Sequence, residues 1–442
     1  MKFTGVKTKT KKVLDLLRAY EPANMLWIAP DGSWPIVWAR AKGMNVWDAE
    51  GRKYMDLTAA FGVAAAGHGR GRVVAAGQRQ MGKLPHAMGD VHPHALKAQL
   101  ARELSRITFE RWTSGATAGK TIFANSGFEA VETCLKTALL ATGKRRILAF
   151  TGAYHGLGYG ALNATHRAYF REPFGAQLGQ FGRFVPFPKE ADNLAVTKDR
   201  VTKLLRSQQF GAILAEPIQG RGGVNVPPRG FLPLLRTLCD QYGALLILDE
   251  IFTGFGRTGT WFACEHSRTT PDLICLGKAL TGGFPLSACV GRAELMDAAW
   301  PPSTGEAIHT STFQGHPVGC AMALAQIKEI ETHSLPVRSA ILGAHLMQQL
   351  RAEISAPGYS IEVRGRGLMA GLEIRKAGGG PATALVLETV KKMLHRGFIL
   401  LPEGEFGNVI SFTPPLIITK AQIAAMVAAL QRALSDAASK MK

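Results

Sequence analysis

The sequence predicts an α/β protein with a mostly parallel sheet covered by helices, followed by a smaller α+β region. Between residues 121 and 290, short and nearly continuous apolar runs alternate with longer amphipathic stretches. Runs of this kind are typical of strands whose two faces are both buried by crossover helices. After Gly315 this alternation gives way to long helical stretches and scattered short strands. The change predicts a second, smaller unit.

The N-terminal part predicts one helix, a small group of strands and two further helices. Apolar residues recur at helical spacing over residues 11–20. Residues 37–57 consist of short β-like runs broken by glycines, which indicates a hairpin or meander. The spacing over residues 72–107 favours two helices, separated by residues 85–93.

Six apolar runs then predict the strands of the main sheet. They are Thr121–Ala124, Arg146–Phe150, Gly211–Ala215, Ala244–Leu248, Leu273–Leu276 and Ala288–Val290. Helical stretches lie between several of them, notably residues 129–141 and 231–242. Ligands of open α/β sheets gather at the carboxyl ends of the strands. The residues that follow these runs are therefore the candidates for a functional site.

The C-terminal part predicts a smaller α+β unit. The expected helices are residues 318–334, 337–354, 382–396 and 420–435, and the expected strands lie near Phe398 and Val409. A glycine-rich loop at residues 378–380 separates two of these elements. Neither an internal repeat nor a low-complexity linker is visible in the sequence, so both units are expected to be folded.

Composition argues against several classes of protein. The chain of 442 residues is 46% hydrophobic and 19% charged, which is typical of a globular protein. No apolar run approaches the ~20 residues needed to cross a bilayer. The basic N-terminus lacks the apolar core and cleavage site of a secretory signal. Six cysteines without a CxxC pair are typical of free thiols, so we expect a cytoplasmic protein.

The formal net charge of +19 is the one unusual global property. Basic residues are scattered, and the only dense cluster lies over residues 7–12. No nucleic-acid-binding motif accompanies the charge. It is interpreted as a source of solubility and of attraction for anionic ligands, with no nucleic-acid or membrane partner expected.

A phosphate site is predicted directly after the first run of the sheet. Ser126 can cap a helix, and Glu129 stands three residues later, at the spacing of a capping box. Gly127, followed by Phe128, permits close approach, so the free N–H groups and the helix dipole suit an anion. A plain helix cap is the alternative interpretation.

Aromatic and acidic side chains follow the next two runs. Tyr154 and His155 are flanked by glycines, so an aromatic ring can lie against a planar ligand there. A half-buried surface pair is the alternative. Glu216 follows the third run, where a buried carboxylate needs a partner, either a ligand or a salt bridge.

Asp249 follows the fourth run, which is wholly apolar. A carboxylate there is costly unless it faces a cation, and a protonated pyridine nitrogen is such a cation. A metal ion is the rival, but no cluster with ligand spacing accompanies Asp249, so no metal is predicted. Residues 254–259 match GxGxxG, yet they neither directly follow a strand nor open a helix, which argues against a nicotinamide site.

Lys278 follows the fifth run, between Gly277 and a glycine-bearing turn. Desolvation at such a position lowers the pKa of a lysine and makes the neutral, nucleophilic amine accessible. A solvated loop lysine is the simpler interpretation of this residue alone. However, a phosphate cradle, a stacking aromatic, a carboxylate for a ring nitrogen and an amine nucleophile together suit pyridoxal 5′-phosphate (PLP). The sequence therefore predicts a PLP enzyme.

Nearly the whole chain also resembles the class III (ω-) aminotransferases of PLP fold type I. The motifs that carry the resemblance are Gly43–Gly51, Leu248–Ile251, Thr253–Gly259 and Pro414–Leu416, together with the run from Asp249 to Lys278. The resemblance implies a seven-stranded sheet in a large PLP-binding domain, residues 61–315. It also implies a small domain made from both chain ends, residues 1–60 and 316–442.

The resemblance assigns roles to the candidate residues. Lys278 would hold the cofactor as a Schiff base and move the substrate proton, and Asp249 would keep the pyridine nitrogen protonated. Tyr154 would stack on the ring, and Glu216 would support the site. Thr312 would reach the phosphate of the neighbouring subunit in an obligate homodimer with its site at the interface. The expected cofactor-binding residues are Ser126, Gly127, Phe128, Tyr154, His155, Glu216, Asp249, Ile251, Lys278 and Thr312.

Three positions depart from common patterns of the family. Phe128 stands where a small hydroxyl residue is frequent, and Phe252 where many members carry Gln. Ser411 stands where members specialised for ornithine-type α-amino acids often have Arg, so bidentate recognition of an α-carboxylate is lost there. The predicted donor is therefore an ω-amino acid, a β-amino acid or a plain amine. Arg167 and Arg171 are the candidates for binding the carboxylate of the keto acid.

The predicted function is transfer of an amino group from such a donor to a keto acid of the pyruvate or 2-oxoglutarate type, in two half-reactions. A PLP-dependent racemase, aminomutase or decarboxylase is the first alternative, because the same cofactor residues serve them all. A basic, nucleic-acid-binding or regulatory protein with an aminotransferase-like body is the second. The intact pair of Lys278 and Asp249 argues against it.

Overall fold

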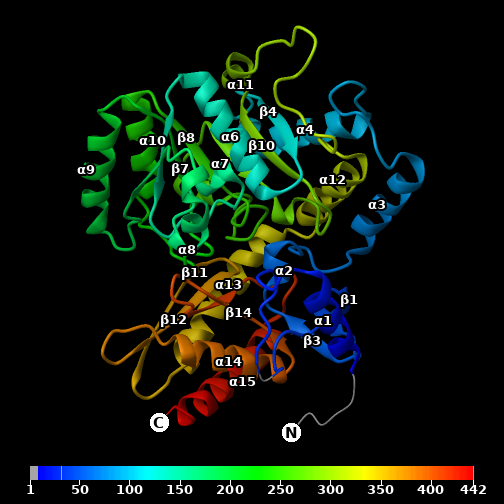
Figure 1. The fold of residues 1–442 in the computed structure, drawn as a ribbon, viewed down its shortest axis with the longest axis vertical. Coiled ribbons are helices and arrows are strands. Elements are labelled where there is room, and N and C mark those ends of the chain that lie inside the picture. Colours follow the sequence, from blue (N-terminus) through cyan, green and yellow to red (C-terminus); the bar gives the residue numbers. More distant parts are fainter. Residues whose placement is uncertain (1–7, 31, 442) are drawn as a thin grey trace.

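The computed structural model describes residues 8–30 and 32–441. Figure 1 shows two bodies: a larger one with the main sheet and its helices, and a smaller one where N-terminal strands and C-terminal helices lie together. Of the basic cluster at residues 7–12, Lys7 lies outside the described residues, and residues 9–12 belong to the first helix.

The main sheet has seven strands in the order β4-β10-β9-β8-β7-β5-β6. Its strands are β4 (Gly119–Ala124), β5 (Arg146–Phe150), β6 (Gly182–Val185), β7 (Phe210–Ala215), β8 (Leu245–Asp249), β9 (Leu273–Leu276) and β10 (Ser287–Arg292). All neighbours are parallel except β10, which is antiparallel to both β4 and β9. The predicted fold class and its six runs are confirmed, and β6 is a strand that the runs did not include.

Helices cover both faces of this sheet, as the continuous apolar runs require. Ile247 of β8 packs in the cluster that contains α6 (Gly127–Thr142). Its neighbours Leu246 and Leu248 pack in the opposite cluster, with α10 (Phe231–Tyr242). Since successive side chains of a strand point to opposite faces, both faces of β8 are buried.

The remaining helices of this body are short or peripheral. They are α3 (Gly71–Lys83), α4 (Ala95–Ile107), α5 (Phe109–Trp112), α7 (Tyr159–Leu162), α8 (Ala168–Arg171), α9 (Asn193–Leu205) and α11 (Ala293–Ala299), with 3-10 turns at Glu172–Gln177, Ala263–Ser267 and Lys278–Leu280. The helix α12 (Pro317–Thr332) packs against α3 and α4, beside the main sheet. The domain boundaries at residues 60 and 315 stay a prediction.

The smaller body contains two four-stranded sheets. One has the order β1 (Trp38–Lys42), β2 (Asn45–Asp48), β3 (Lys53–Asp56) and β13 (Phe398–Ile399). The other has the order β11 (Tyr359–Arg366), β12 (Met369–Lys376), β15 (Val409–Phe412) and β14 (Leu401–Glu403). Because β13 pairs in parallel with β3, the first sheet joins segments from both ends of the chain.

Helices complete the smaller body. They are α1 (Lys9–Tyr20), α2 (Ala59–Gly62), α13 (Leu335–Glu353), α14 (Thr383–His395) and α15 (Lys420–Ser439). The helix α15 packs against α13 and α14. The helices and strands expected in both terminal parts are thus present, with ends that differ by a few residues.

Residues 254–259 form consecutive turns and not a strand-to-helix junction, in agreement with the rejection of a nicotinamide site. Arg257 in this segment is only 1% exposed. Its guanidinium donates to the carbonyls of Leu368 at 3.0 Å and Pro414 at 2.6 Å. The segment therefore links the main body to the smaller one.

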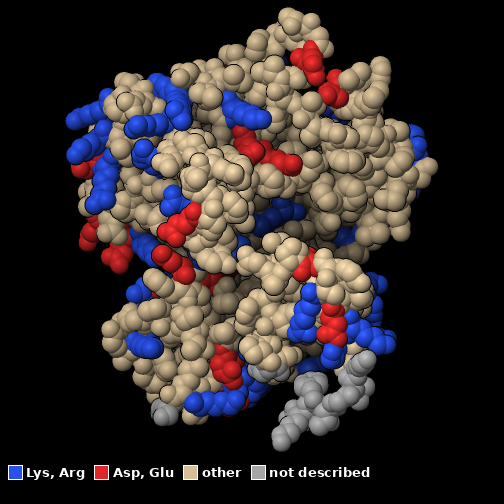
Figure 2. All heavy atoms as spheres, in the orientation of Figure 1, with Lys and Arg blue, Asp and Glu red and all other residues tan. Residues whose placement is uncertain are grey.

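Basic side chains are scattered over the surface, as they are along the sequence. Lysine and arginine side chains are spread over both bodies on the face in Figure 2, and they form no single stripe there. Within residues 8–30 and 32–441, none of the helices has the length and apolar character required to traverse a bilayer.

Candidate active site

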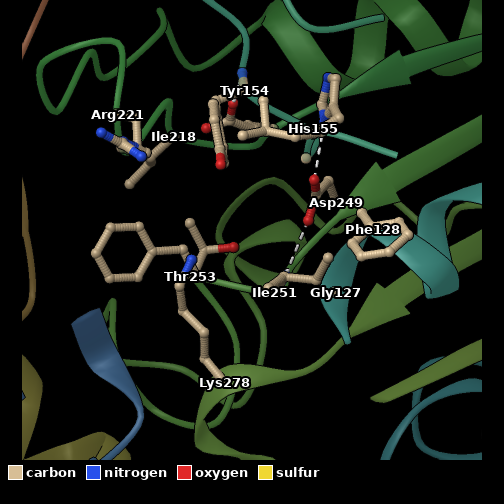
Figure 3. A pocket seen from close by; sticks show the side chains of 14 residues that line it. Gly127, Phe128, Tyr154, His155, Ile218, Arg221, Asp249, Ile251, Thr253 and Lys278 are labelled. Atoms are coloured by element: carbon tan, nitrogen blue, oxygen red, sulfur yellow. Dashed lines mark hydrogen bonds and ion pairs between the residues drawn. The ribbon is translucent and has the colours of Figure 1, made fainter. Parts of the chain in front are cut away.

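A cavity of about 350 Å³ lies at the carboxyl ends of the main-sheet strands. It is lined by Gly127, Phe128, Tyr154, His155, Gly156, Leu157, Glu216, Ile218, Arg221, Asp249, Ile251, Phe252, Thr253 and Lys278. Figure 3 draws the side chains of these residues around one space and labels ten of them. Their segments lie at the ends of five strands, β4, β5, β7, β8 and β9, and one of them opens α6, so the sheet itself brings them together.

Eight of the ten cofactor-binding residues predicted from the sequence line this cavity. Ser126 precedes the lining residue Gly127. Thr312 does not line the cavity and is exposed in the segment between α11 and α12. The structure therefore brings the predicted residues together except Thr312, whose expected contact involves a second subunit.

Lys278 begins a short 3-10 turn directly after β9 and is partly buried. Burial lowers the pKa of its amine, while the carboxylates of Asp249 and Glu216 act in the opposite direction. The amine nitrogen lies 4.1 Å from the centroid of the Phe252 ring. A lysine in this environment reaches the neutral, nucleophilic form more easily than a solvated one.

The Asp249 carboxylate ends β8 and is held by two donors. One oxygen is 2.8 Å from Nδ1 of His155, and the other accepts from the backbone N–H of Ile251 at 3.1 Å (Figure 3). The side chains of Asp249 and His155 are both buried. Nε2 of His155 has no hydrogen-bond partner among the described residues. The carboxylate is thus oriented at the cavity and still has free lone pairs for a cationic N–H.

Glu216 forms hydrogen bonds with two loops that line the cavity. Its two oxygens accept from the backbone N–H groups of Tyr154 and Gly220, both at 2.8 Å. Burial raises the pKa of this carboxyl to about 7, although nearby His155 acts in the opposite direction. The pattern indicates that Glu216 positions the loops that carry Tyr154 and Gly220.

The start of α6 has the features of an anion site. The Glu129 carboxylate accepts from the backbone N–H groups of Asn125 at 2.7 Å and Ser126 at 2.8 Å. The hydroxyl oxygen of Ser126 is buried and has no partner among the described residues. A side chain at Gly127 would lie 3.1 Å from Ile251. An unpartnered hydroxyl at a helix N-terminus beside a glycine fits a phosphate group.

The two phenylalanines that depart from the family patterns are accommodated by glycines. A Cβ at Gly158 would lie 2.4 Å from the ring of Phe128. A Cβ at Gly220 would lie 2.3 Å from the ring of Phe252, and one at Gly62 would lie 2.7 Å from the same ring. The glycines therefore leave room for the larger side chains, and Phe252 uses that room to reach Lys278.

Sequence reasoning missed one charged residue of the cavity, Arg221. Its guanidinium carbon lies 4.8 Å from the centroid of the Tyr154 ring. The arginines proposed from the sequence lie elsewhere: Arg167 donates to the carbonyl of Gly404, and Arg171 packs over Phe184, away from the cavity lining. The position of Arg221 directly after the Glu216–Gly220 segment was the available signal.

Comparison with known proteins defines the family. A model described as "Aminotransferase class-III" matches residues 28–434. The chain therefore belongs to the class III aminotransferases, which are PLP-dependent. The unpartnered Ser126 hydroxyl, the oriented Asp249 carboxylate and the partly desolvated Lys278 amine fit this cofactor.

Individual relatives are similar over almost their full length. The 5-aminovalerate aminotransferase DavT of Pseudomonas aeruginosa is 38% identical, covering 91% of this chain and 94% of that protein. The putrescine aminotransferase of Pectobacterium atrosepticum is 37% identical, covering 94% and 86%. Among solved structures, a PLP-bound amine transaminase from an uncultivated Pseudomonas species has a TM-score of 0.83 at 30% identity, covering 94% and 98%. The chain is thus an aminotransferase of fold type I.

Proposed function

We propose that this enzyme moves an amino group from an ω-amino acid, a β-amino acid or a carboxylate-free amine to a keto acid of the pyruvate or 2-oxoglutarate type. The observation that carries the proposal is the placement of Lys278 and Asp249 in one cavity with an anion site at the start of α6. Two relatives whose names specify 5-aminovalerate and putrescine support this class of donor.

Each residue of the cavity has a separate role in the proposed reaction. Bound PLP supplies an electron-withdrawing ring that stabilises the charge left when a bound amine loses a proton from its carbon. The amine of Lys278 takes that proton and returns it during each half-reaction. The Asp249 carboxylate, oriented by His155, would hold a proton at the ring nitrogen. The hydroxyl of Ser126 and the backbone N–H of Gly127 would bind the phosphate, and Tyr154 would contact the ring.

The test is the visible absorption spectrum of the purified, PLP-loaded protein before and after each of a panel of amines, without any keto acid. A cofactor band that is lost with particular amines, with release of a carbonyl product, supports the proposal. A band that persists while the substrate is racemised, rearranged or decarboxylated would overturn the reaction type. Absence of a band after incubation with PLP would overturn the assignment of Lys278.

Donor preference is expected to favour the terminal amine. With 5-aminopentanoate and its isomer 2-aminopentanoate as donors, kcat/KM should be about ten- to hundredfold higher for the first, because Ser411 leaves an α-carboxylate without a guanidinium on the β15 side of the cavity. Pentylamine serves as the carboxylate-free reference. Alanine and glutamate are omitted, since their reaction is the reverse of the acceptor half-reaction. Faster turnover of 2-aminopentanoate would contradict the proposed donor class.

A homodimer is proposed from an exposed apolar surface near Thr312. Phe313 contacts His86, and Thr310 donates to Asp90 at 2.5 Å, so residues 86–90 and 310–313 lie side by side. Exposed Met88, Ile308 and Phe313 lie on these segments or directly beside them. A second copy that covers this surface would bring Thr312 near a neighbouring site. Sedimentation as a single 47.5 kDa chain at micromolar concentration would contradict this.

The cytoplasm remains the proposed location. All six cysteines are buried free thiols, which fits a reducing compartment.

A further inference from the structure

Arg221 is the arginine whose side chain lines the cavity. It lies on the loop after β7, beside Tyr154, on a different side of the cavity from Asp249 (Figure 3). A guanidinium keeps its charge at all ordinary pH values and matches a carboxylate with two parallel N–H donors. Arg221 is therefore placed to meet the substrate end remote from the ring-nitrogen carboxylate.

Within the described part of the chain, Arg221 has a single ion-pair partner, and the two side chains are loosely paired. Nε of Arg221 lies 3.6 Å from a carboxylate oxygen of Glu403, which is beyond ordinary hydrogen-bond distance. The same Nε is buried and has no hydrogen-bond partner among the described residues. The Glu403 carboxylate thus balances the charge of Arg221 but leaves its Nε–H without a hydrogen bond. A buried donor without a partner gains free energy when a closer acceptor binds.

Glu403 is a buried counter-ion supplied by the smaller body. It ends β14 and is 8% exposed. Burial raises the pKa of its carboxyl, whereas the charges of Arg221, Arg167 and Lys278 act in the opposite direction. A buried carboxylate of this kind is costly without a cation. We therefore expect Glu403 to stay paired with Arg221 when no other anion is bound.

The sheet register relates this pair to Ser411. Leu401 of β14 is paired with Ser411 of β15, and Glu403 is paired with Val409. Paired residues and alternate residues of antiparallel strands share one face of a sheet, so Ser411 and Glu403 point to the same side. The face of this sheet that carries Ser411, where some relatives have an arginine, therefore also carries the carboxylate of Glu403. The positive charge comes instead from Arg221, on the loop after β7.

Arg167 has a different task. It donates to the backbone carbonyls of Gly404 and, at 3.3 Å, of Arg221. Those contacts tie the loop that carries Arg221 to the turn after Glu403. Arg167 is therefore a positioning residue for the pair, and Arg221 is the arginine with an unused donor.

We propose that Arg221 binds the carboxylate of the keto acid acceptor, exchanging Glu403 for it, and that Glu403 neutralises Arg221 when the bound substrate has no carboxylate at that end. The ligand class is a 2-oxo acid. The inference rests on the proposed transaminase function and adds the residue that recognises the acceptor.

The test compares Arg221→Gln and Glu403→Gln with wild type, all loaded with PLP. The first readout is the Kd of glutarate, which has the carbon skeleton of 2-oxoglutarate without its keto group, measured by calorimetry at fixed ionic strength. Arg221→Gln should weaken glutarate binding by about ten- to hundredfold, because a charge-assisted bidentate contact is lost. Glu403→Gln should tighten it several-fold, since the competing carboxylate is gone.

The second readout separates the two half-reactions. Arg221→Gln should raise KM for the keto acid by a similar factor, with kcat changed little, and change the pentylamine half-reaction by less than about threefold. Arg375→Gln is the matched control, because Arg375 forms a 2.7 Å ion pair with Glu373 in the same small sheet and does not line the cavity.

The outcomes distinguish this inference from the function on which it rests. If no amine converts the cofactor of the wild type, the proposed function fails. If the wild type converts amines but Arg221→Gln binds glutarate as tightly as the wild type, only the role of Arg221 is overturned. Should Arg221→Gln fold poorly, Glu403→Gln decides alone: weaker or unchanged glutarate binding would overturn the exchange of partners.

Discussion

Replacing Lys278 with alanine is expected to slow the amine half-reaction by about 10³- to 10⁴-fold, since the variant lacks the group that moves the substrate proton. The amine is placed at the end of β9 with a lowered pKa, and no other lysine lines the cavity formed by the described residues. The measurement is the rate at which pentylamine removes the cofactor band in a stopped-flow instrument.

Two variants complete this experiment. Lys278→Arg keeps the positive charge but cannot provide a neutral amine, so it should be as slow as the alanine variant. Lys120→Ala changes an exposed lysine paired with Asp297 and should leave the rate unchanged. Borohydride treatment should attach the cofactor covalently to the peptide that contains Lys278 in the wild type only. An alanine variant within tenfold of the wild-type rate would contradict the assigned role.

Replacing Asp249 with asparagine is expected to lower kcat/KM by about 10³-fold. The amide has the same shape, but it carries no charge to keep a proton on the ring nitrogen. It also replaces the charged partner of His155 Nδ1, now 2.8 Å away. The measurement combines kcat/KM for 5-aminopentanoate with the pH dependence of the cofactor spectrum, which a purely structural role would not shift.

A conservative comparison controls for loss of folding. Thermal unfolding of the PLP-loaded Asp249→Asn protein shows whether the site is intact. His155→Gln removes the group that orients the carboxylate while leaving the carboxylate itself, and should therefore reduce kcat/KM less than Asp249→Asn does. If His155→Gln were the more damaging change, Asp249 would act mainly by holding His155.

The main sheet was predictable because its central strands are buried on both faces. All six residues of β7 are buried, and such a strand leaves a continuous apolar run in the sequence. The edge strand β6 was not predicted, because Gly182 and the exposed Arg183 interrupt any such run. The antiparallel orientation of β10 could not be predicted either, because a short apolar run does not indicate in which direction the strand runs relative to its neighbours.

The candidate site was predictable where a residue ends a strand or follows it within two positions. Asp249 and Lys278 are of this kind, and both line the cavity. Arg221 was missed because its environment depends on Glu403, which reaches it from a different body of the protein. Local sequence describes a strand end well, but it does not report which distant segment folds over that end.

The parallel pairing of β13 with β3 has a consequence for biosynthesis. The N-terminal meander is complete in sequence once residue 56 has left the ribosome, yet the edge formed by β3 stays uncovered until residues 398 and 399 emerge. Glu403 follows in the same late segment. Contacts of such long separation are formed slowly, and an open strand edge favours pairing with other chains. Nascent chains halted before residue 398 are therefore the species that would most need a chaperone.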